Sequence, residues 1–595
     1  MKSHNGYVVI CCLVFVFLVV CLPLAAQENM YGQPGRQRMF SVGHPVYQLL
    51  EDAYRDAGRV LPELAWPASA AQLGFMIDQL NDARLSAAGR ARLEAAARYL
   101  KAWDGPAPVL SEAQAGMAVQ FVPIINLQVR FDDENPQQQV LAPPLDLLRL
   151  DVRAQMAPVF AEMQAALRQE PNYDYLSPGS RSNIPMNIDH ADSNFPKRAY
   201  MASGTERWSI QLGRDKLSWG TSQTGSLTLS GKAPYHDFIR IAGFFRSFSY
   251  SGIFMRQEPF ARQNEIPSEG PYVPPVILRD DDGDPLSPED HYRHWQKALV
   301  IHRFTMRPID SLRFSLMESV GIAGYTPDLR FFNPFMVNHN YYDFTTMTFA
   351  TSAEITLTPM AGLEISGQWY MNDFMLPQEE AAGATEPNAM AWLGGVHWQR
   401  PLGQQADSAL LKLGGEIYYG DPYVYIRESV LRSFISRQRV HTNWNGSGMS
   451  LGMIEWNDEF LGSPFGNDSF AWQLRAEISW LQLARVQTDF VRHSDGQNGP
   501  ADILPADGSA VLQETPSGVA ENINQWTIAA DVSSQGIAPL HNVLSHGLPG
   551  GWFAGTVLDL GAVVRLVWLE NADHVQGRTD FRPGVAAKMG VSWQW

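Results

Sequence analysis

Apolar and polar residues alternate one by one along many segments of this chain after about residue 116. Such alternation puts apolar side chains on one face of an extended strand and polar side chains on the other. It therefore predicts β-strands whose two faces meet different surroundings. The clearest examples are residues 125–132, 148–156 and 472–480.

The polar faces of these strands carry charges of both signs, which is typical of the lumen of a transmembrane barrel. Long segments rich in Gly, Pro and Asp separate the strands, and long loops at one end with short turns at the other are usual in outer-membrane barrels. The 480 residues from 116 to 595, at roughly 27–30 per strand with its loop, predict about 16–18 antiparallel strands. The long segments are 257–294, 376–388, 426–449 and 493–521.

The predicted fold class is an all-β transmembrane barrel with a small N-terminal α-helical unit. A barrel of this width has room for an aqueous lumen unless the helical unit or inward loops fill it. Composition excludes other classes. The mean hydropathy of -0.19 is too low for a polytopic helical membrane protein. The net charge of -17, from 45 Lys+Arg against 62 Asp+Glu, argues against nucleic acid as a partner.

The last segment of the chain is the strongest single signal for a barrel. One face of this predicted strand is apolar, and its tip is the terminal aromatic residue. This resembles the C-terminal assembly signal of bacterial outer-membrane barrels, so we expect an outer-membrane location with membrane lipid and the barrel assembly machinery as partners. The apolar face consists of Val585, Ala587, Met589, Val591, Trp593 and Trp595.

Residues 1–26 are predicted to be a secretory signal peptide. Lys2 precedes an apolar run over 7–22, and small residues follow it before Gln27. An uncleaved anchor helix and lipidation at Cys21 are the alternatives. Removal of the signal would leave a mature chain without cysteine, and hence without a disulfide or thiolate metal site. The three cysteines are Cys11, Cys12 and Cys21.

Three helices are predicted before the strands, within a periplasmic unit at 27–108 that precedes a barrel at 109–595. The first carries one apolar face from Val46 to Ala57, and Gly58 ends it. Ser69 with Gln72 forms a capping box for the second helix, and Ser86 can cap the third.

Several motifs occur in an order that resembles the capsule assembly Wzi family, over roughly residues 205–470. The family is one of outer-membrane β-barrels that act as surface lectins. The motifs are Gly213 to Gly220 (GRDKLSWG), Leu229 to Pro234 (LSGKAP), Phe332 to Phe335 (FNPF), Gly367 to Phe374 (GQWYMNDF), Gly415 to Tyr419 (GEIYY) with Pro422 to Tyr425 (PYVY), and Leu461-Gly462 before Gly466 to Ser469 (GNDS).

This resemblance implies a barrel with a periplasmic helical bundle that binds, and anchors or helps assemble, exported surface polysaccharide. It brings no catalytic residue, metal or cofactor. Asn372 stands where an acidic residue is more usual in the family. Aromatic faces stack on sugar rings, and Arg forks bind hydroxyls or acidic sugars. The predicted ligand-binding residues at motif positions are Arg214, Trp219, Asn333, Gln368, Asp373 and Tyr425. Each of these residues also has a purely structural interpretation, in a turn or an interfacial belt.

Two other functions stay open from the sequence alone. An outer-membrane porin or solute-uptake channel would explain the mixed charges on the strands, such as Arg149, Asp151 and Arg153. An outer-membrane hydrolase would need His493 and Ser494 as a catalytic pair, but adjacent strand residues point to opposite faces, and a loop turn is the preferred interpretation there. The acidic run 280–284 lacks EF-hand spacing and is best explained as a solvated loop rather than a Ca²⁺ site.

Overall fold

The computed structural model describes residues 35–101, 110–112, 117–131, 148–156, 158–167, 169–172, 179–182, 196–220, 222–258, 297–323, 329–336, 347–374, 387–427, 429–442, 453–481, 483–499, 502, 504, 513–533 and 557–592. The predicted signal peptide, the acidic run 280–284 and the terminal Trp593 and Trp595 lie outside these residues.

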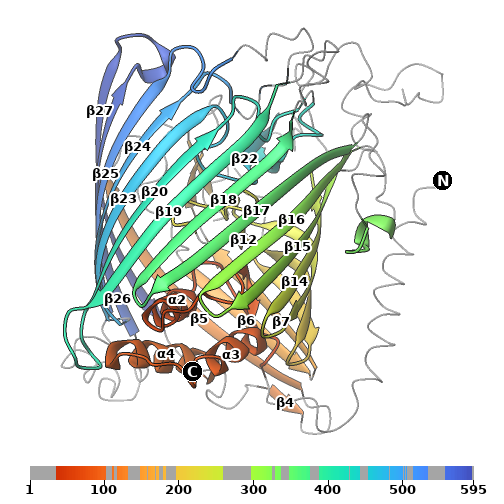
Figure 1. The fold of residues 1–595 in the computed structure, drawn as a ribbon, viewed down its shortest axis with the longest axis vertical. Helices are drawn as coiled ribbons and strands as arrows, with labels where there is room; N and C mark the ends of the chain where they lie inside the picture. The colour runs from red at the N-terminus through yellow and green to blue at the C-terminus, as the bar shows by residue number, and fades with distance from the viewer. Residues whose placement is uncertain are drawn as a thin grey trace, which may run out of the picture.

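The described strands form a closed antiparallel barrel (Figure 1). Eighteen strands make its wall, a number within the predicted range. The pairing of the last strand with β5 closes the ring, with Val591 opposite Ile125. Around the ring they are β5 (Met117–Phe131), β6 (Leu148–Met156), β7 (Val159–Leu167), β10 (Ala199–Gly204), β11 (Trp208–Asp215), β13 (His236–Phe244), β14 (Phe248–Gln257), β15 (Lys297–Ile309), β16 (Leu312–Ala323), β17 (Met347–Met360), β18 (Leu363–Asp373), β19 (Ala389–Pro401), β20 (Leu410–Gly420), β23 (Ser469–Trp480), β24 (Ala484–Asp495), β25 (Glu521–Ser533), β26 (Val557–Glu570) and β27 (Thr579–Ser592).

Shorter elements complete the described fold. The helices are α2 (Pro45–Asp56), α3 (Ala70–Asp78) and α4 (Ala87–Lys101), with the 3₁₀ turns η2 (Leu329–Phe332) and η6 (Ala572–His574). Among these described helices, none is long and apolar enough to cross a membrane. The remaining strands are β4 (Leu110–Glu112), which lies beside β5, and the pairs β1 (Met39–Phe40) with β3 (Ala68–Ser69), β2 (Ala65–Trp66) with β12 (Ser218–Trp219), β8 (Gln169–Asn172) with β9 (Gly179–Ser182), and β21 (Ile435–Thr442) with β22 (Met453–Phe460).

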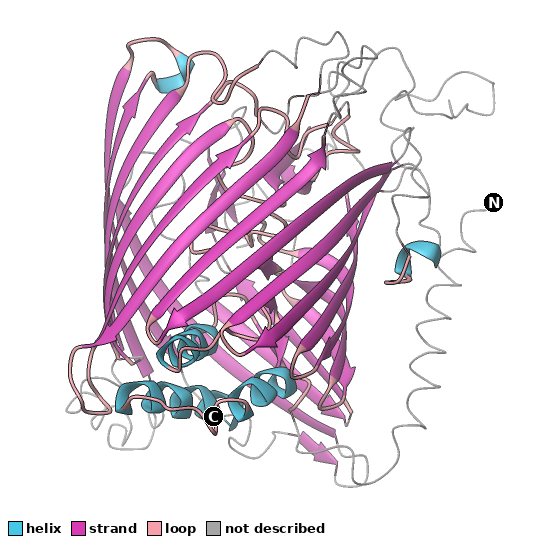
Figure 2. Cartoon of the chain, in the orientation of Figure 1, coloured by secondary structure: helices cyan, strands magenta, loops and turns pink. Residues whose placement is uncertain are grey.

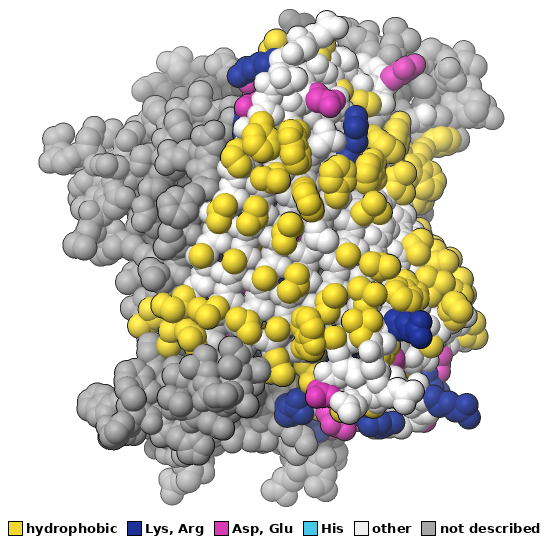
Figure 3. Space-filling view, turned by 90° about the vertical axis from the view of Figure 1, so that its left-hand side faces the viewer, with side chains coloured by type: hydrophobic (Ala, Val, Ile, Leu, Met, Phe, Trp, Pro, Cys, Tyr) yellow, Lys and Arg dark blue, Asp and Glu magenta, His cyan; other side chains and the backbone are white. Residues whose placement is uncertain are grey.

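The predicted alternation is confirmed by burial along the wall. On β23, Leu474 is 56% exposed while its neighbour Gln473 is 5% exposed. On β27, Val585 is 46% exposed and Ala586 is 3% exposed. Figure 3 shows hydrophobic side chains spread over the outer wall, with charged side chains gathered toward its two ends. The apolar faces therefore point outward, as strands in contact with lipid require.

The two ends of the barrel differ, as predicted. At one end the strands are joined mainly by short turns, such as 310–311 and 361–362, and the helices lie there (Figure 2). The amide N of Gly362 donates to the carbonyl O of Arg55 at 2.7 Å, which ties a wall turn to α2. At the opposite end, called the outer end below, the strands are separated by longer stretches of chain, such as those between β14 and β15 and between β20 and β23.

The three predicted helices are confirmed, with Ser69 and Ser86 as caps, but the predicted capping box is only half formed because the Gln72 side-chain oxygen has no hydrogen-bond partner. Gly58, just after α2, has φ of +68°, a conformation that favours glycine. The Ser69 hydroxyl accepts from the Gln72 amide at 3.1 Å and begins α3. The Ser86 hydroxyl accepts from the Gly89 amide at 3.0 Å and begins α4. The N-cap of α2 is His44, whose Nδ1 accepts from the Val46 amide at 3.2 Å.

One local prediction is wrong. Residues 493–495 do not form a loop turn but are the last residues of β24. They pair with the first residues of β23, with Asp495 opposite Ser469. The reason is that the ladder supplies a partner for each backbone group there, and this outweighs the turn preference of the Ser-Asp-Gly sequence.

Replacing Leu474 with Arg should destabilise the barrel by roughly 2–4 kcal/mol, because this side chain lies on the lipid-facing wall. The measurement is urea unfolding of the protein folded into lipid vesicles. Gln487→Arg is the matched control, because Gln487 lies on the neighbouring strand and lines an interior cavity. Equal losses in the two variants would contradict the assignment of the faces.

Acid should weaken the start of α2. Burial, followed by the nearby Arg38 charge, lowers the pKa of His44 from 6.5 to about 3. Since the unfolded chain binds this proton more readily, stability is full above pH 6.5 and falls as pH drops toward 3. His44→Asn keeps a capping side chain but does not titrate. We expect thermal unfolding of this variant to vary less between pH 7 and pH 4 than in the unaltered protein; an identical pH dependence would count against the cap.

Candidate functional site

An apolar core fills the outer half of the barrel. It combines inward side chains of the wall, such as Ile253, Leu299 and Leu393, with side chains from two connections that turn into the lumen. We call the described residues of 216–235 and of 421–468 the inner segments. Their members of this core are Leu217, Trp219, Leu227, Leu229, Tyr423, Val424, Tyr425, Ile426, Val430, Leu431, Phe434, Ile435, Phe460, Leu461 and Phe465.

The first inner segment meets the N-terminal part of the chain inside the barrel. Its strand β12 pairs with β2, placing Trp219 opposite Ala65. The Gly220 amide donates to the Leu64 carbonyl at 3.1 Å. Gly220 has φ of +125°, and a Cβ there would lie 2.7 Å from the Ser226 hydroxyl, so the path requires glycine. Chain from both ends of the barrel therefore meets in the lumen.

One buried carboxylate holds the turn of this segment against the wall. Glu416 of β20 accepts from the amides of Gln223 at 2.7 Å and Thr224 at 2.9 Å. It also accepts from the hydroxyls of Ser222 and Thr224, at 2.9 and 2.7 Å. The imidazole Nε2 of His397 lies 3.3 Å from the carboxylate. A single side chain of the wall thus satisfies four donors of the inner segment.

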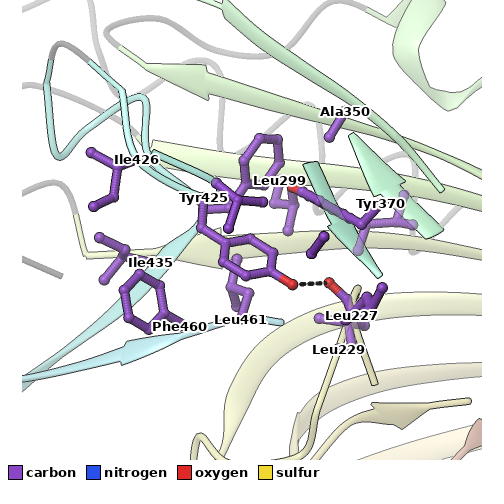
Figure 4. Packing of buried hydrophobic residues seen from close by; sticks show 14 of the residues in the cluster. Leu227, Leu229, Leu299, Ala350, Tyr370, Tyr425, Ile426, Ile435, Phe460 and Leu461 are labelled. Atoms are coloured by element: carbon purple, nitrogen blue, oxygen red, sulfur yellow. Dashed lines mark hydrogen bonds between the residues drawn. The ribbon is translucent and has the colours of Figure 1, made fainter. Parts of the chain in front are cut away.

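A second anchor joins three elements at Leu227 (Figure 4). Gln368 of β18 accepts from the Leu227 amide at 2.9 Å, and the Tyr425 hydroxyl donates to the Leu227 carbonyl at 2.8 Å. The Tyr425 ring lies 4.8 Å from Tyr370 and 5.7 Å from Phe460. The two inner segments are therefore fastened to each other as well as to the wall.

Wall charges hold the second inner segment. The Lys297 ammonium donates to the carbonyls of Val430 at 2.9 Å and Ile435 at 3.0 Å. At the end of β18, the Asp373 carboxylate pairs with Arg427 at 2.5 Å. Charged groups on the lumen side are thus used to fix loops in place.

At the opposite end, ion pairs fix the helical unit and the segment that follows α2. Arg55 of α2 pairs with Glu364 of the wall at 3.1 Å. Arg303 pairs with Glu63 at 3.0 Å and with Glu354 at 3.4 Å, and all three side chains are buried. Burial without these partners would be costly, so the helical unit and the wall are held in one arrangement.

A cavity of about 850 Å³ lies between these two layers. The first inner segment borders it at 218–223, and α2 borders it from the other side. The wall of the cavity is formed by the helix-end halves of β20 and β23–β27, with charges of both signs: Lys412, Arg475, Glu477, Arg485, Asp531, Asp559 and Lys588. Lys412 pairs with Asp52 at 2.8 Å and Arg485 with Asp531 at 2.7 Å, so the charges balance one another.

The structure brings three predicted site residues together and leaves three apart. Trp219, Gln368 and Tyr425 all lie in or against the apolar core, with Trp219 and Tyr425 fully buried. Asp373 lies at the outer rim of the wall. The contacts of these four residues explain them as structural residues that hold the inner segments in the lumen. Ligand binding by them stays a prediction.

The two other predicted residues lie on accessible surfaces. The Arg214 guanidinium pairs with Asp237 at 2.7 Å at the outer end of β11 and lies 4.1 Å from the centre of the Tyr235 ring. Asn333 is exposed after η2, and its side-chain oxygen accepts from the Phe335 amide at 3.1 Å. Sequence reasoning missed Glu416, which accepts four hydrogen bonds from the first inner segment, although it lies in the motif Gly415 to Tyr419. No sequence pattern indicates that residues 222–224 bind it.

The other sequence hypotheses gain little from the geometry. The register places His493 opposite Ala471 on the lumen side and Ser494 opposite Phe470 on the outer side. Ser494 donates to Asn522 at 2.6 Å, not to the histidine. Arg149 and Arg153 both pair with Asp151, at 2.9 and 3.4 Å. Within the described part of the chain, no group of three or more His, Cys, Asp or Glu is placed to hold a metal ion.

Comparisons with known proteins support the fold. No protein-family model matches the chain, and no curated protein matches it. Among solved structures, the chain is similar to Wzi of Escherichia coli, described as an outer-membrane protein involved in group 1 capsule assembly and as a carbohydrate-binding β-barrel. The two are 14% identical, the match covers 92% of this chain and 98% of Wzi, and the TM-score is 0.53.

Two other solved structures are more distant. OprD of Pseudomonas aeruginosa is 10% identical, with 82% of this chain and 100% of OprD covered and a TM-score of 0.36. OccAB1 of Acinetobacter baumannii is 9% identical, with 80% and 96% covered and a TM-score of 0.33. The outward apolar wall and the closed strand ladder, together with the likeness to Wzi, make this chain a multi-pass β-barrel of the outer-membrane type.

Removing the Glu416 carboxylate should loosen the first inner segment. Glu416→Ala leaves four donors without an acceptor, at a cost of about 1–3 kcal/mol for each donor that stays buried. We expect ion-current openings in planar bilayers to become more frequent than in the unaltered protein.

Glu514→Ala is the matched control, because this carboxylate is exposed on an outer connection. It should leave the current record unchanged. If Glu416→Ala conducts no more than Glu514→Ala, the anchor does not keep the lumen closed.

Proposed function

We propose that this chain is a non-catalytic outer-membrane barrel that binds exported surface polysaccharide at its outer end and anchors or helps assemble it. The observation that carries the proposal is the apolar core built from the inner segments. The inner segments fold inward and fill the outer half of the lumen. The outer end therefore presents an ordered protein surface instead of an open channel entrance. The order of sequence motifs and the similarity to a carbohydrate-binding barrel support the same function.

The proposed orientation follows from the two ends. Short turns usually face the periplasm, so we place the helical unit on that side, as part of a periplasmic unit at 27–108 before a barrel at 109–595. The outer connections then face the cell exterior, where polysaccharide would meet them. Membrane lipid and the barrel assembly machinery are the other partners of the proposal.

Arg214 is the proposed direct contact among the six motif residues. Its side chain is 24% exposed at the outer rim, and Asp237 and Tyr235 fix its orientation. A held guanidinium fork suits sugar hydroxyls or acidic sugars. Asn333 is also exposed, but it lies in the segment packed on the outside of the wall, so it is not a proposed contact with polymer. For Trp219, Gln368, Asp373 and Tyr425, any effect on binding would act through the shape of the outer surface.

The test is polymer retention in cells. Deleting the gene should leave polymer synthesis intact but shift polymer from the cell surface to the medium, because its anchor is lost. Arg214→Gln should lower the amount of cell-bound polymer while folded protein stays at its normal level. Unchanged cell-bound polymer after the deletion would contradict the proposal.

Arg485→Gln is the matched control for Arg214→Gln. Both arginines pair with an aspartate at 2.7 Å, but Arg485 lies at the cavity near the helix end. It should retain polymer normally. Equal losses in both variants would indicate a general weakening of the barrel rather than a contact with polymer.

A channel for small solutes is the second candidate, favoured by the cavity with its mixed charges. Single-channel recording of the purified, unaltered protein separates the two. Open and stable pores would favour solute uptake, and a silent barrel would favour the polysaccharide surface.

A further inference from the structure

The short segment that contains η2 lies against the outside of the barrel. Phe331 packs among outward residues of the wall in one buried cluster, with Val300 of β15 and Val320 of β16. The Phe332 ring lies 5.2 Å from that of Phe254 on β14. In Figure 1 this segment is the short green helix to the right of the barrel, at about mid-height. This part of the chain between β16 and β17 thus lies against the outer wall.

The wall beneath the segment carries a polar side chain that faces outward. On β15, Ile301 and Arg303 point into the lumen, so His302 points toward the membrane, as does Met306. Met306 is 45% exposed, but His302 is only 3% exposed. The segment is what covers it, since the Phe331 carbonyl lies 2.7 Å from His302 Nε2.

The hydrogen bonds of His302 are complete under this cover. Because a carbonyl can only accept, Nε2 donates to the Phe331 carbonyl, and Nδ1 then accepts from the Tyr250 hydroxyl at 2.8 Å. The neighbour of His302 across the ladder is Glu318, on the same outward face of β16. Polar groups on a lipid-facing wall are costly unless they are covered and paired.

Three amides of the segment are hydrogen-bonded within the segment. The Asn333 amide donates to the Arg330 carbonyl at 3.1 Å, and Pro334 has no N–H. The amides of Phe335 and Met336 donate to the side chain and the carbonyl of Asn333, each at 3.1 Å. Irregular backbone is excluded from hydrocarbon because its polar groups lack partners. These bonds, with that of the Phe331 carbonyl to His302, meet the requirement for the groups named.

Two aromatic side chains of the segment are exposed. Phe332 is 42% exposed and Phe335 is 87% exposed. Their surroundings continue the outward apolar belt, in which Leu316 of β16 is 55% exposed and Ile355 of β17 is 53% exposed. An exposed phenylalanine beside such a belt is stabilised most when it leaves water and contacts the same lipid as the belt.

We propose that residues 331–336 form a re-entrant cover that is embedded in the outer leaflet, where Phe332 and Phe335 contact lipid acyl chains while Phe331 shields His302. The cover binds lipid rather than polysaccharide, and it does not depend on the function proposed above. Its role is to give the barrel a fixed lipid contact on the β14–β16 side.

The test uses a fluorescent label at Phe335→Cys in the full chain, with any of Cys11, Cys12 and Cys21 that remain replaced by serine. The protein is folded into phosphatidylcholine vesicles that contain a doxyl-labelled phosphatidylcholine. We expect lipid quenching within about twofold of that at Leu316→Cys on the wall, together with protection from aqueous iodide. The same label at Phe332→Cys is a second reporter of the cover.

Gln576→Cys, in the exposed turn before β27, is the aqueous control and should show strong iodide quenching with weak lipid quenching. If the label at Phe335→Cys behaves like this control, the segment lies in water and the proposal is wrong. Rapid disulfide-linked dimerisation of the unlabelled Phe335→Cys protein in the vesicles, with an added oxidant, would also overturn it, because a second copy of the chain would then occupy the surface.

Discussion

The structure depends on the rule that a strand in hydrocarbon must pair on both edges. Lipid offers no donor or acceptor to a free strand edge, so the sheet has to close on itself. The pairing of β27 with β5 provides that closure. Closure at this strand number leaves a lumen wider than the wall side chains can fill. The inner segments and the helical unit are the consequence, because that space has to be filled or left to water.

Much of this arrangement could be predicted because it rests on local periodicity. Alternation identified the lipid-facing side of β23 and β27, and Ser69 and Ser86 identified two helix starts. These signals act over neighbouring residues, so the sequence displays them. The wrong prediction at His493 has a different origin, since pairing of β24 with β23 on one edge and β25 on the other decided the outcome over the local turn preference.

The candidate site was less predictable, because depth inside a barrel is a tertiary property. Trp219 and Tyr425 are motif residues that could equally have been stacking platforms or belt aromatics, yet they lie in the core. A Gly-rich polar connection that turns into the lumen looks the same in sequence as one that extends into water. The deciding partners, such as Glu416 and Gln368, lie on strands far along the chain.

The charged lumen faces show why one sequence pattern fitted two functions. A porin lines its channel with charges of both signs, and so does this wall. Here, however, Lys297 and Glu416 bond to inner segments. Arg55 of α2 pairs with the wall carboxylate of Glu364, and Arg303 of the wall pairs with Glu63 in the chain after α2. Charged groups that are paired with protein segments inside the barrel are not available to bind ions that pass through it. In the described part of the chain, the paired charges around the cavity still face open space, as charges in a channel interior do.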